Sequence, residues 1–162
     1  MTRSHAREIA IHMIFSLSFG NMKAEELLEQ QLNRERFEEL SADMPLYGMY
    51  PNEKQEQYIR NLVKGTFEHG YELDDYIARY AKGWNFARIP RMASAIMRTA
   101  MYEVLYMPEI PNAVAVNEAV EITKNYESPE VVSFVNGVLG TFVRTEFPET
   151  PSKPEKAPEA ED

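Results

Sequence analysis

The feature that most constrains the fold is the stretch from Ile89 to Met107, which reads IPRMASAIMRTAMYEVLYM. At helical spacing its apolar residues form a broad arc, made of Ile89, Met92, Ala93, Ile96, Met97, Ala100, Met101 and Val104. One polar stripe remains, made of Arg91, Ser94, Arg98 and Tyr102. A helix at the surface of a bundle shows a narrower apolar face. We therefore predict a central helix that other helices cover on most sides and that ends before Pro108.

Glu103 falls inside this apolar arc. A buried carboxylate needs hydrogen bonds or a cation, because burying it without a partner is costly. It could accept hydrogen bonds from the backbone N–H groups that begin the next helix, or it could act as a catalytic acid or base. Buried polar groups more often anchor structure than perform chemistry. We therefore predict that Glu103 is buried and bonded to amides near residues 112–116.

Six further amphipathic segments accompany this helix, and no alternating pattern is long enough to support a sheet. They cover roughly residues 4–19, 24–40, 52–70, 72–81, 112–126 and 128–146. Ser4, Asn112 and Ser128 are predicted N-caps, and Pro129 suits the first helical position. The connections are short, which is typical of packed helices. The sequence therefore predicts an all-α bundle of seven helices.

Two local features of the second half of the chain carry further expectations. Gly137 and Gly140 lie inside the last helix, where each lowers helix propensity by about 1 kcal/mol relative to alanine. We expect another backbone to approach closely there. Trp84 is the only tryptophan, and we expect it and Phe86 to fill the seam between two groups of helices.

Composition excludes several classes of protein. No run approaches the roughly 20 apolar residues of a membrane span, and the N-terminus lacks the continuous apolar region of a signal peptide. The absence of cysteine excludes disulfides, thiolate metal sites and a cysteine nucleophile, so we expect a cytoplasmic protein. The net charge of −9 argues against general coating of nucleic acid. Residues 147–162 combine prolines with five acids and two lysines, which predicts a disordered acidic tail.

The chain shows no Gly-rich phosphate loop, no HExxH sequence and no serine elbow. His5, Glu8 and His12 share one helical face and could meet on a metal, but such a trio near a chain end is usually a solvated face. Asp74 and Asp75 are adjacent, so their carboxylates point in different directions on a helix. We therefore predict no enzyme, no metal and no cofactor.

The basic N-terminus carries a binding hypothesis instead. Arg3 and Arg7 lie one turn apart at the start of the first helix. The N–H groups that a helix leaves unpaired at this end bind phosphate, and the two guanidinium groups would add charge. The alternative is a pair of ordinary exposed arginines, and these two residues alone favour that alternative.

Four motifs in order resemble the family of NusB transcription antitermination factors. They are Ala6-Arg7-Glu8-Ile9-Ala10, the run RTAMYEVL from Arg98 to Leu105, the run VAVNEAV over residues 114–120, and the run FVNGVL over residues 134–139. Together they extend over nearly the whole chain. Only the loop at residues 41–51 and the tail lie outside the resemblance.

The resemblance implies a seven-helix domain over residues 1–146, with an N-terminal subdomain of about 1–70 and a C-terminal subdomain of about 71–146. It implies an adaptor without enzymatic activity. This adaptor would bind the boxA element of nascent ribosomal RNA together with NusE, a ribosomal protein of the small subunit. The pair would then join the antitermination complex on RNA polymerase.

The resemblance also implies site residues. RNA binding would fall on Arg3, Ser4, His5, Arg7, Lys124, Tyr126 and Phe134. Core packing is the alternative role for Tyr126 and Phe134. NusE would contact Phe15, Arg91, Ala93 and Ser94. The chain departs from the family pattern in three ways: Ser4 and His5 interrupt the arginine run, Phe15 replaces a tyrosine, and Ala93-Ser94 replaces an acidic–basic pair.

Two other functions stay open at this point. The first is a structural homodimer, or a protein-only helical scaffold, in which the basic surface is masked. The second is a stand-alone relative of the RNA-binding domain of ribosomal RNA methyltransferases. The sequence shows no methyltransferase domain beside the helical one.

Overall fold

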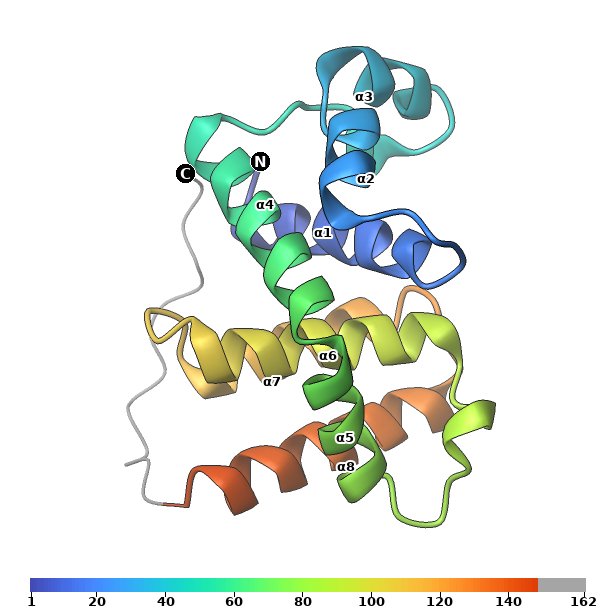
Figure 1. Ribbon diagram of the computed structural model, residues 1–162, viewed down its shortest axis with the longest axis vertical. Coiled ribbons are helices and arrows are strands. Elements are labelled where there is room, and N and C mark those ends of the chain that lie inside the picture. Colours follow the sequence, from blue (N-terminus) through green and yellow to red (C-terminus); the bar gives the residue numbers. More distant parts are fainter. Residues whose placement is uncertain (149–162) are drawn as a thin grey trace. The chain divides into compact units, whose positions relative to one another are not determined.

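The computed structural model describes residues 1–148, and this part of the chain holds eight α-helices, two short 3₁₀ helices and no strand (Figure 1). The predicted all-α class is confirmed. The predicted number of seven helices is wrong by one. The tail from residue 149 to 162, predicted to be disordered, lies outside the described residues. No helix in the described part is both long enough and apolar enough to cross a membrane.

The chain divides into two compact units, and the first comprises Met1–Glu68. Its helices are α1 (Arg3–Leu17), α2 (Ala24–Gln31), α3 (Arg34–Ser41), the 3₁₀ helix η1 (Pro45–Tyr47) and α4 (Glu53–Glu68). Helix α1 packs along α4, and α2 lies against both helices (Figure 1). The core of this unit is apolar, with Ile9 and Met13 of α1 and Ile59 of α4 almost fully buried.

The extra helix arises because the predicted helix over residues 24–40 is broken at Leu32 and Asn33. Leu32 leaves the helical region, with φ −96° and ψ 69°. The Asn33 side chain then accepts a hydrogen bond from the backbone N–H of Arg36 at 2.8 Å. Asparagine favours this local bond over a continuing helix. Asn33 therefore ends α2 and caps α3.

A histidine and a tyrosine meet inside this unit. The His12 Nδ1 atom lies 2.8 Å from the Tyr47 hydroxyl oxygen, which ties α1 to η1. Burial raises the pKa of Tyr47 to about 12, with a smaller contribution from the Glu8 carboxylate. Burial also lowers the pKa of His12 from 6.5, and Glu8 opposes this shift. The folded unit therefore favours the neutral imidazole.

We expect the stability of the chain to fall below about pH 6.5, because the unfolded state then takes up a proton at His12 that the folded state resists. The contribution is complete above this pH and is lost as the pH falls toward the lowered pKa. His12→Gln should flatten this part of the profile. Urea unfolding at pH 7.5 and 5.5 measures it, with His5→Gln, at an exposed position of the same helix, as the control. A His12 variant with the wild-type profile would contradict the assignment.

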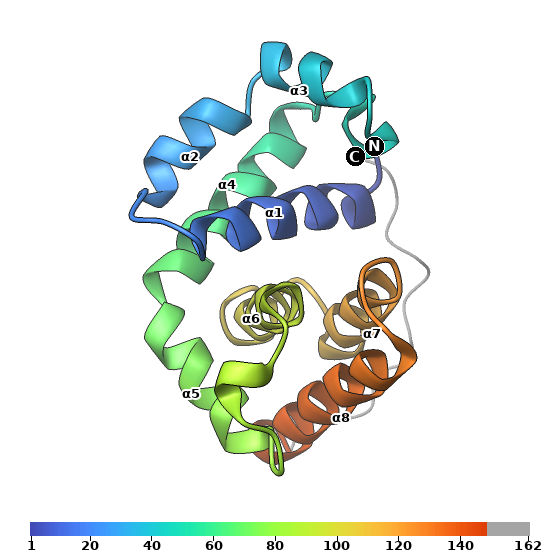
Figure 2. The same ribbon diagram turned by 90° about the vertical axis from the view of Figure 1, so that its right-hand side faces the viewer.

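The second unit begins at His69. Its elements are α5 (Gly70–Tyr80), the 3₁₀ helix η2 (Phe86–Arg88), α6 (Arg91–Tyr106), α7 (Asn112–Thr123) and α8 (Pro129–Glu146). Helix α6 packs against α5, α7 and α8, which surround it in Figure 2. Ten of its sixteen residues are buried. The prediction of a central helix is confirmed within this unit.

The polar residues of α6 differ in their burial. Glu103 is 0% exposed, so its predicted burial is confirmed, while its bond to amides near residues 112–116 stays a prediction. Ser94, a member of the polar stripe, is also buried, with 8% exposed. Arg98 pairs with Asp74 of α5 through two contacts, Nε to Oδ1 at 2.6 Å and Nη2 to Oδ2 at 3.0 Å. This two-point pair fixes α5 on α6.

The predicted N-caps are confirmed in one case of three. The Ser128 hydroxyl accepts a hydrogen bond from the Val131 N–H, and Pro129 is the first residue of α8. Helix α1 instead begins one residue before Ser4, with Thr2 as its N-cap. Helix α7 begins at Asn112, after Pro111. Pro111 has a fixed φ of −60°, which directs the chain into the helix without a side-chain cap.

The expectation for Gly137 is wrong. A Cβ atom built at Gly137 meets nothing within 4 Å, so no backbone approaches this face of α8. At Gly140 the nearest atom is Nη1 of Arg144, at 3.0 Å, which belongs to a side chain. The two glycines therefore have different surroundings, and only Gly137 faces open space.

We expect Gly137→Ala to raise the free energy of unfolding by about 1 kcal/mol, because alanine has the higher helix propensity and nothing blocks its methyl group. Gly140→Ala is the matched control on the same helix, and its gain should be smaller because the Arg144 side chain must move. Chemical denaturation measures both. A loss of stability in Gly137→Ala would contradict this description of α8.

Candidate nucleic-acid interface

The first candidate surface lies at the start of α1 in the first unit. Thr2 has extended backbone and its hydroxyl accepts a hydrogen bond from the His5 N–H at 3.1 Å. The first turn of this helix contains no acidic residue. His5 is exposed, whereas Arg3 and Ser4 are half-buried. This end of the helix therefore combines a positive dipole, a cation and an imidazole without a competing carboxylate in that turn.

An aromatic ring positions Arg3. The guanidinium carbon of Arg3 lies 4.4 Å from the centre of the Tyr58 ring, and Tyr58 belongs to α4. Tyr58 is only 6% exposed, so its ring is held firmly by the core. An arginine over an aromatic face is stabilised by a cation–π interaction. The Arg3 side chain is thus held in one orientation before any ligand arrives.

A glutamine anchors the chain just before α1. The Gln55 side-chain amide donates a hydrogen bond to the Met1 carbonyl oxygen. Its side-chain oxygen accepts from the Asn52 N–H at 2.9 Å, while Asn52 Oδ1 accepts from the Gln55 N–H at 2.8 Å. This reciprocal pair is a capping box at the start of α4. Gln55 therefore links the start of α4 to the N-terminal residues beside Arg3.

Arg7 does not belong to the same surface. Its side chain is 1% exposed and is one of the largest fully buried side chains of the described residues. Its guanidinium carbon lies 5.9 Å from the centre of the Tyr58 ring. The prediction that Arg3 and Arg7 together form a phosphate-binding pair at the surface is wrong for Arg7. Its charge lies inside the protein, where it orders α1.

The second candidate surface lies where α7 ends and α8 begins, in the second unit. Lys124 is exposed, follows the last residue of α7, and forms an ion pair with Glu121 at 3.0 Å. Tyr126 is 37% exposed in the turn between the helices. Tyr126 is therefore not fully buried, and its role in base stacking stays a prediction. These two residues meet the chemical needs of a single-stranded RNA contact.

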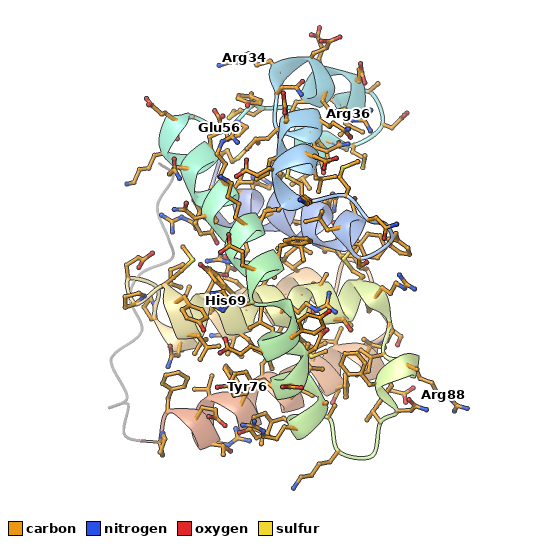
Figure 3. The ribbon with its side chains drawn as sticks, in the orientation of Figure 1. Arg34, Arg36, Glu56, His69, Tyr76 and Arg88 are labelled. Atoms are coloured by element: carbon orange, nitrogen blue, oxygen red, sulfur yellow. The ribbon has the colours of Figure 1, made fainter. Side chains whose placement is uncertain are left out.

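Phe134 has a more mixed environment. It is half-buried on α8, and its ring centre lies 4.3 Å from that of Trp84, with 37° between the planes. Trp84 is 36% exposed and Phe86 is 40% exposed. The expectation that Trp84 and Phe86 fill a seam is wrong, because both rings reach the surface. Arg88 lies in the connection between α5 and α6 that also contains Trp84 and Phe86, and its side chain extends outward in Figure 3.

The four residues predicted to face NusE differ in exposure. Arg91 is exposed and Phe15 is half-buried, with its ring 4.8 Å from that of Phe19. Phe19 is 59% exposed, so this aromatic pair reaches the surface. Ala93 is 0% exposed and Ser94 is 8% exposed. A partner could therefore contact Phe15 or Arg91 directly, but not Ala93 in this conformation.

The metal alternative receives no support from geometry. Within residues 1–148, no group of three histidine, aspartate or glutamate side chains is placed so that it could hold a metal ion. His12 instead pairs with Tyr47, which takes it away from His5. The shared helical face of His5, Glu8 and His12 does not bring the three side chains onto one point.

Sequence reasoning missed Tyr58 and Gln55, which organise the first surface. The contact of Tyr58 with Arg3 joins two helices that are far apart in the sequence, so no local pattern predicts it. For Gln55 a local signal existed, because Asn52 followed by glutamine three residues later is a capping-box pattern. Its second bond, to Met1, had no such signal.

Comparison with known proteins identifies the family. The sequence model of the NusB family matches residues 4–144. The chain belongs to the NusB family. The transcription antitermination protein NusB of Acetivibrio thermocellus is 37% identical over 147 residues, which cover 91% of this chain and 92% of that protein. NusB of Carboxydothermus hydrogenoformans is 38% identical over 140 residues, covering 86% and 91%.

Solved structures agree with this assignment at the level of the fold. NusB of T. maritima matches with a TM-score of 0.72 and 26% identity, over 89% of this chain and 92% of that one. A crystal structure of antitermination factors NusB and NusE in complex with dsRNA contains a chain with a TM-score of 0.71 and 20% identity. That match covers 88% of this chain and 96% of the other. At this identity the second likeness concerns the fold alone.

Proposed function

We propose that this chain is a transcription antitermination adaptor that binds boxA-type nascent ribosomal RNA together with NusE and has no enzymatic role. The observation that carries the proposal is the family match over residues 4–144, to relatives that are antitermination proteins. A NusB–NusE pair bound to RNA is known for a protein of the same fold. The adaptor would act in the antitermination complex of RNA polymerase.

On this proposal, RNA contacts fall on two groups of residues. In the first unit they are Arg3, Ser4 and His5, where the start of α1 offers N–H groups and a ring-supported guanidinium. In the second unit they are Lys124, Tyr126 and Phe134, where a cation and aromatic rings suit phosphate and base. Arg7 supports the first group from inside the protein. NusE contacts would involve Phe15 and Arg91.

Arg3→Ala is expected to weaken RNA binding without lowering stability. Each lost phosphate contact should also reduce the slope of log K against log salt concentration by about 0.7 for single-stranded RNA. The measurement is a titration of boxA RNA over a range of salt, with and without NusE. Since the chain carries a net charge of −9, the total slope should be small and NusE should strengthen binding clearly.

Arg34→Ala is the matched control for this titration. Arg34 is an exposed arginine of the first unit (Figure 3). Like Arg3 it lies over an aromatic ring, with its guanidinium carbon 4.8 Å from the centre of the Tyr50 ring. Its loss should leave both affinity and salt slope unchanged. Identical curves for wild type and Arg3→Ala would remove Arg3 from the interface. An equal loss in both variants would show a general charge effect instead of a site.

Sedimentation separates the adaptor from the homodimer alternative. A masked homodimer would sediment as a dimer and would not bind RNA until it dissociated. The adaptor should form a complex with RNA and NusE that contains one copy of this chain. A dimer that excludes RNA at all concentrations would contradict the proposed function.

A further inference from the structure

A hollow of about 560 Å³ lies in the second unit beside α8. It is lined by Arg79, Tyr80, Lys82, Trp84, Phe134, Gly137, Val138, Thr141 and Thr145. These residues come from the end of α5, the connection that follows it, and one face of α8. The volume is within the range of roughly 300–1,000 Å³ that is usual for small-molecule sites. Of its lining residues, only Phe134 is among the RNA contacts proposed above.

Flat apolar surface forms one wall of the hollow. The rings of Trp84 and Phe134 lie 4.3 Å apart, centre to centre, and Trp84 still exposes 36% of its surface. One turn after Phe134, Gly137 contributes no side chain, and a Cβ atom there would meet nothing within 4 Å. A planar group can therefore lie against the rings and over the bare helix backbone.

The rim of the hollow carries two cations, and the carboxylate of Glu146 lies beside one of them. Among its nine lining residues are two cations, Arg79 and Lys82, and no carboxylate. Arg79 also reaches Glu146, with Nη1 3.3 Å from Oε2, and its guanidinium carbon lies 5.0 Å from the Tyr76 ring centre. These contacts hold Arg79 at the edge of the hollow. Glu146 also accepts a hydrogen bond from the Tyr80 hydroxyl and offsets part of the charge of Arg79, so Lys82 contributes most of the positive charge of the rim. In a chain with a net charge of −9, such a rim favours an anionic occupant.

A nucleotide combines the two properties that this hollow selects, a planar ring and a phosphate. An acidic peptide with an aromatic side chain shares them, but one observation favours RNA. Phe134 belongs both to the hollow and to the second proposed RNA surface, with Lys124 and Tyr126. An RNA strand held there has a base within reach of the same ring, and single-stranded bases stack on aromatic side chains.

We propose that this hollow is a base-binding subsite for single-stranded RNA. One unstacked base lies against Trp84 and over Gly137, and its phosphate faces Lys82 and Arg79. The subsite rests on the proposed RNA-binding function and extends it to residues that the sequence motifs did not assign. Gly137 is then needed for the space that it leaves, although glycine weakens the helix.

The test uses the full chain and Gly137→Leu, which fills the hollow without removing any contact of the fold. Its thermal unfolding temperature should equal or exceed that of wild type. Its affinity for a single-stranded boxA RNA oligonucleotide, with NusE present, should fall about five- to 100-fold. Asn136→Leu is the matched control, at the neighbouring exposed position of α8 that does not line the hollow, and it should bind like wild type.

A second measurement reads the hollow directly, since Trp84 is the only tryptophan of the chain. The RNA should change Trp84 fluorescence in wild type and not in Gly137→Leu, and Lys82→Ala should weaken the change. If RNA binds wild type and Gly137→Leu equally without a change in fluorescence, the subsite is overturned and the proposed function stands. If wild type binds no RNA, both are overturned. A glutamate-rich peptide that contains one phenylalanine and that changes the fluorescence where RNA does not would also overturn the subsite.

Discussion

Arg7→Ala is expected to lower the free energy of unfolding by roughly 2–4 kcal/mol, because it removes a buried guanidinium from the first unit. Arg7 is 1% exposed and lies over the face of Tyr58, with 5.9 Å from its guanidinium carbon to the ring centre. A guanidinium has five N–H donors, so we expect its loss to leave buried acceptors unsatisfied. The methylene groups of the side chain also lose their packing.

Urea denaturation measures this loss, and two further variants sharpen it. Arg7→Lys keeps the charge but loses the planar fork of donors, so it should be destabilising to a smaller extent. Arg34→Ala removes an exposed arginine and should change the free energy of unfolding by less than about 0.5 kcal/mol. Wild-type stability in Arg7→Ala would contradict a structural role and return Arg7 to the candidate RNA surface.

A loss of stability in Arg7→Ala would by itself weaken RNA binding. A weaker complex with Arg7→Ala would follow from partial unfolding of the α1 region, whereas a weaker complex with Arg3→Ala would come from the surface itself. The two cases separate when binding is measured well below the unfolding temperature of each variant. There, Arg3→Ala should still bind weakly with a reduced salt slope, and Arg7→Ala should recover much of its affinity.

Helical periodicity was sufficient to predict most of the fold. The broad apolar arc of α6 predicted a helix covered on most sides, because only a central position can bury so many residues. The Ser128-Pro129 pair predicted the start of α8, because both residues act within one turn of the chain. These features depend on neighbours in sequence. They could therefore be predicted from the sequence without knowledge of tertiary contacts.

The break between α2 and α3 was missed for a related reason. The apolar positions of Leu27, Leu28 and Leu32 continue one helical stripe to the residue before Asn33. Periodicity alone then favours a longer helix. The break depends on whether the Asn33 side chain bonds the Arg36 N–H, which is a competition between two local structures of similar free energy.

The candidate site was less predictable, because it depends on contacts between helices. Arg3 and Arg7 lie one turn apart on α1, yet only Arg7 is fully buried. A signal was present in Ile11, which lies four residues after Arg7 on the same face and is 1% exposed. The burial of both residues shows that α1 is covered on this face as well. The Tyr58 ring that both arginines share comes from α4, which no local pattern places there.

Glu103→Ala is expected to lower the free energy of unfolding by about 1–3 kcal/mol, because it leaves buried hydrogen-bond donors without an acceptor. Glu103 is 0% exposed on α6, the helix that packs against the other three of its unit. Glu109→Ala is the control, since Glu109 is an exposed glutamate just after the same helix, and it should be nearly neutral. An unchanged midpoint in Glu103→Ala would contradict a structural role for the carboxylate.

Glu103→Gln then tests which donors the carboxylate serves. If these are the backbone N–H groups of residues 112–116, as the sequence predicts, the amide oxygen of glutamine can replace a carboxylate oxygen and most of the stability remains. Hydrogen exchange should show faster opening at those amides in Glu103→Ala and near wild-type protection in Glu103→Gln. If the partner is instead a cation, glutamine cannot balance its charge, and Glu103→Gln should lose as much stability as Glu103→Ala. Equal losses in the two variants, with protection at residues 112–116 unchanged, would therefore exclude the amides as partners.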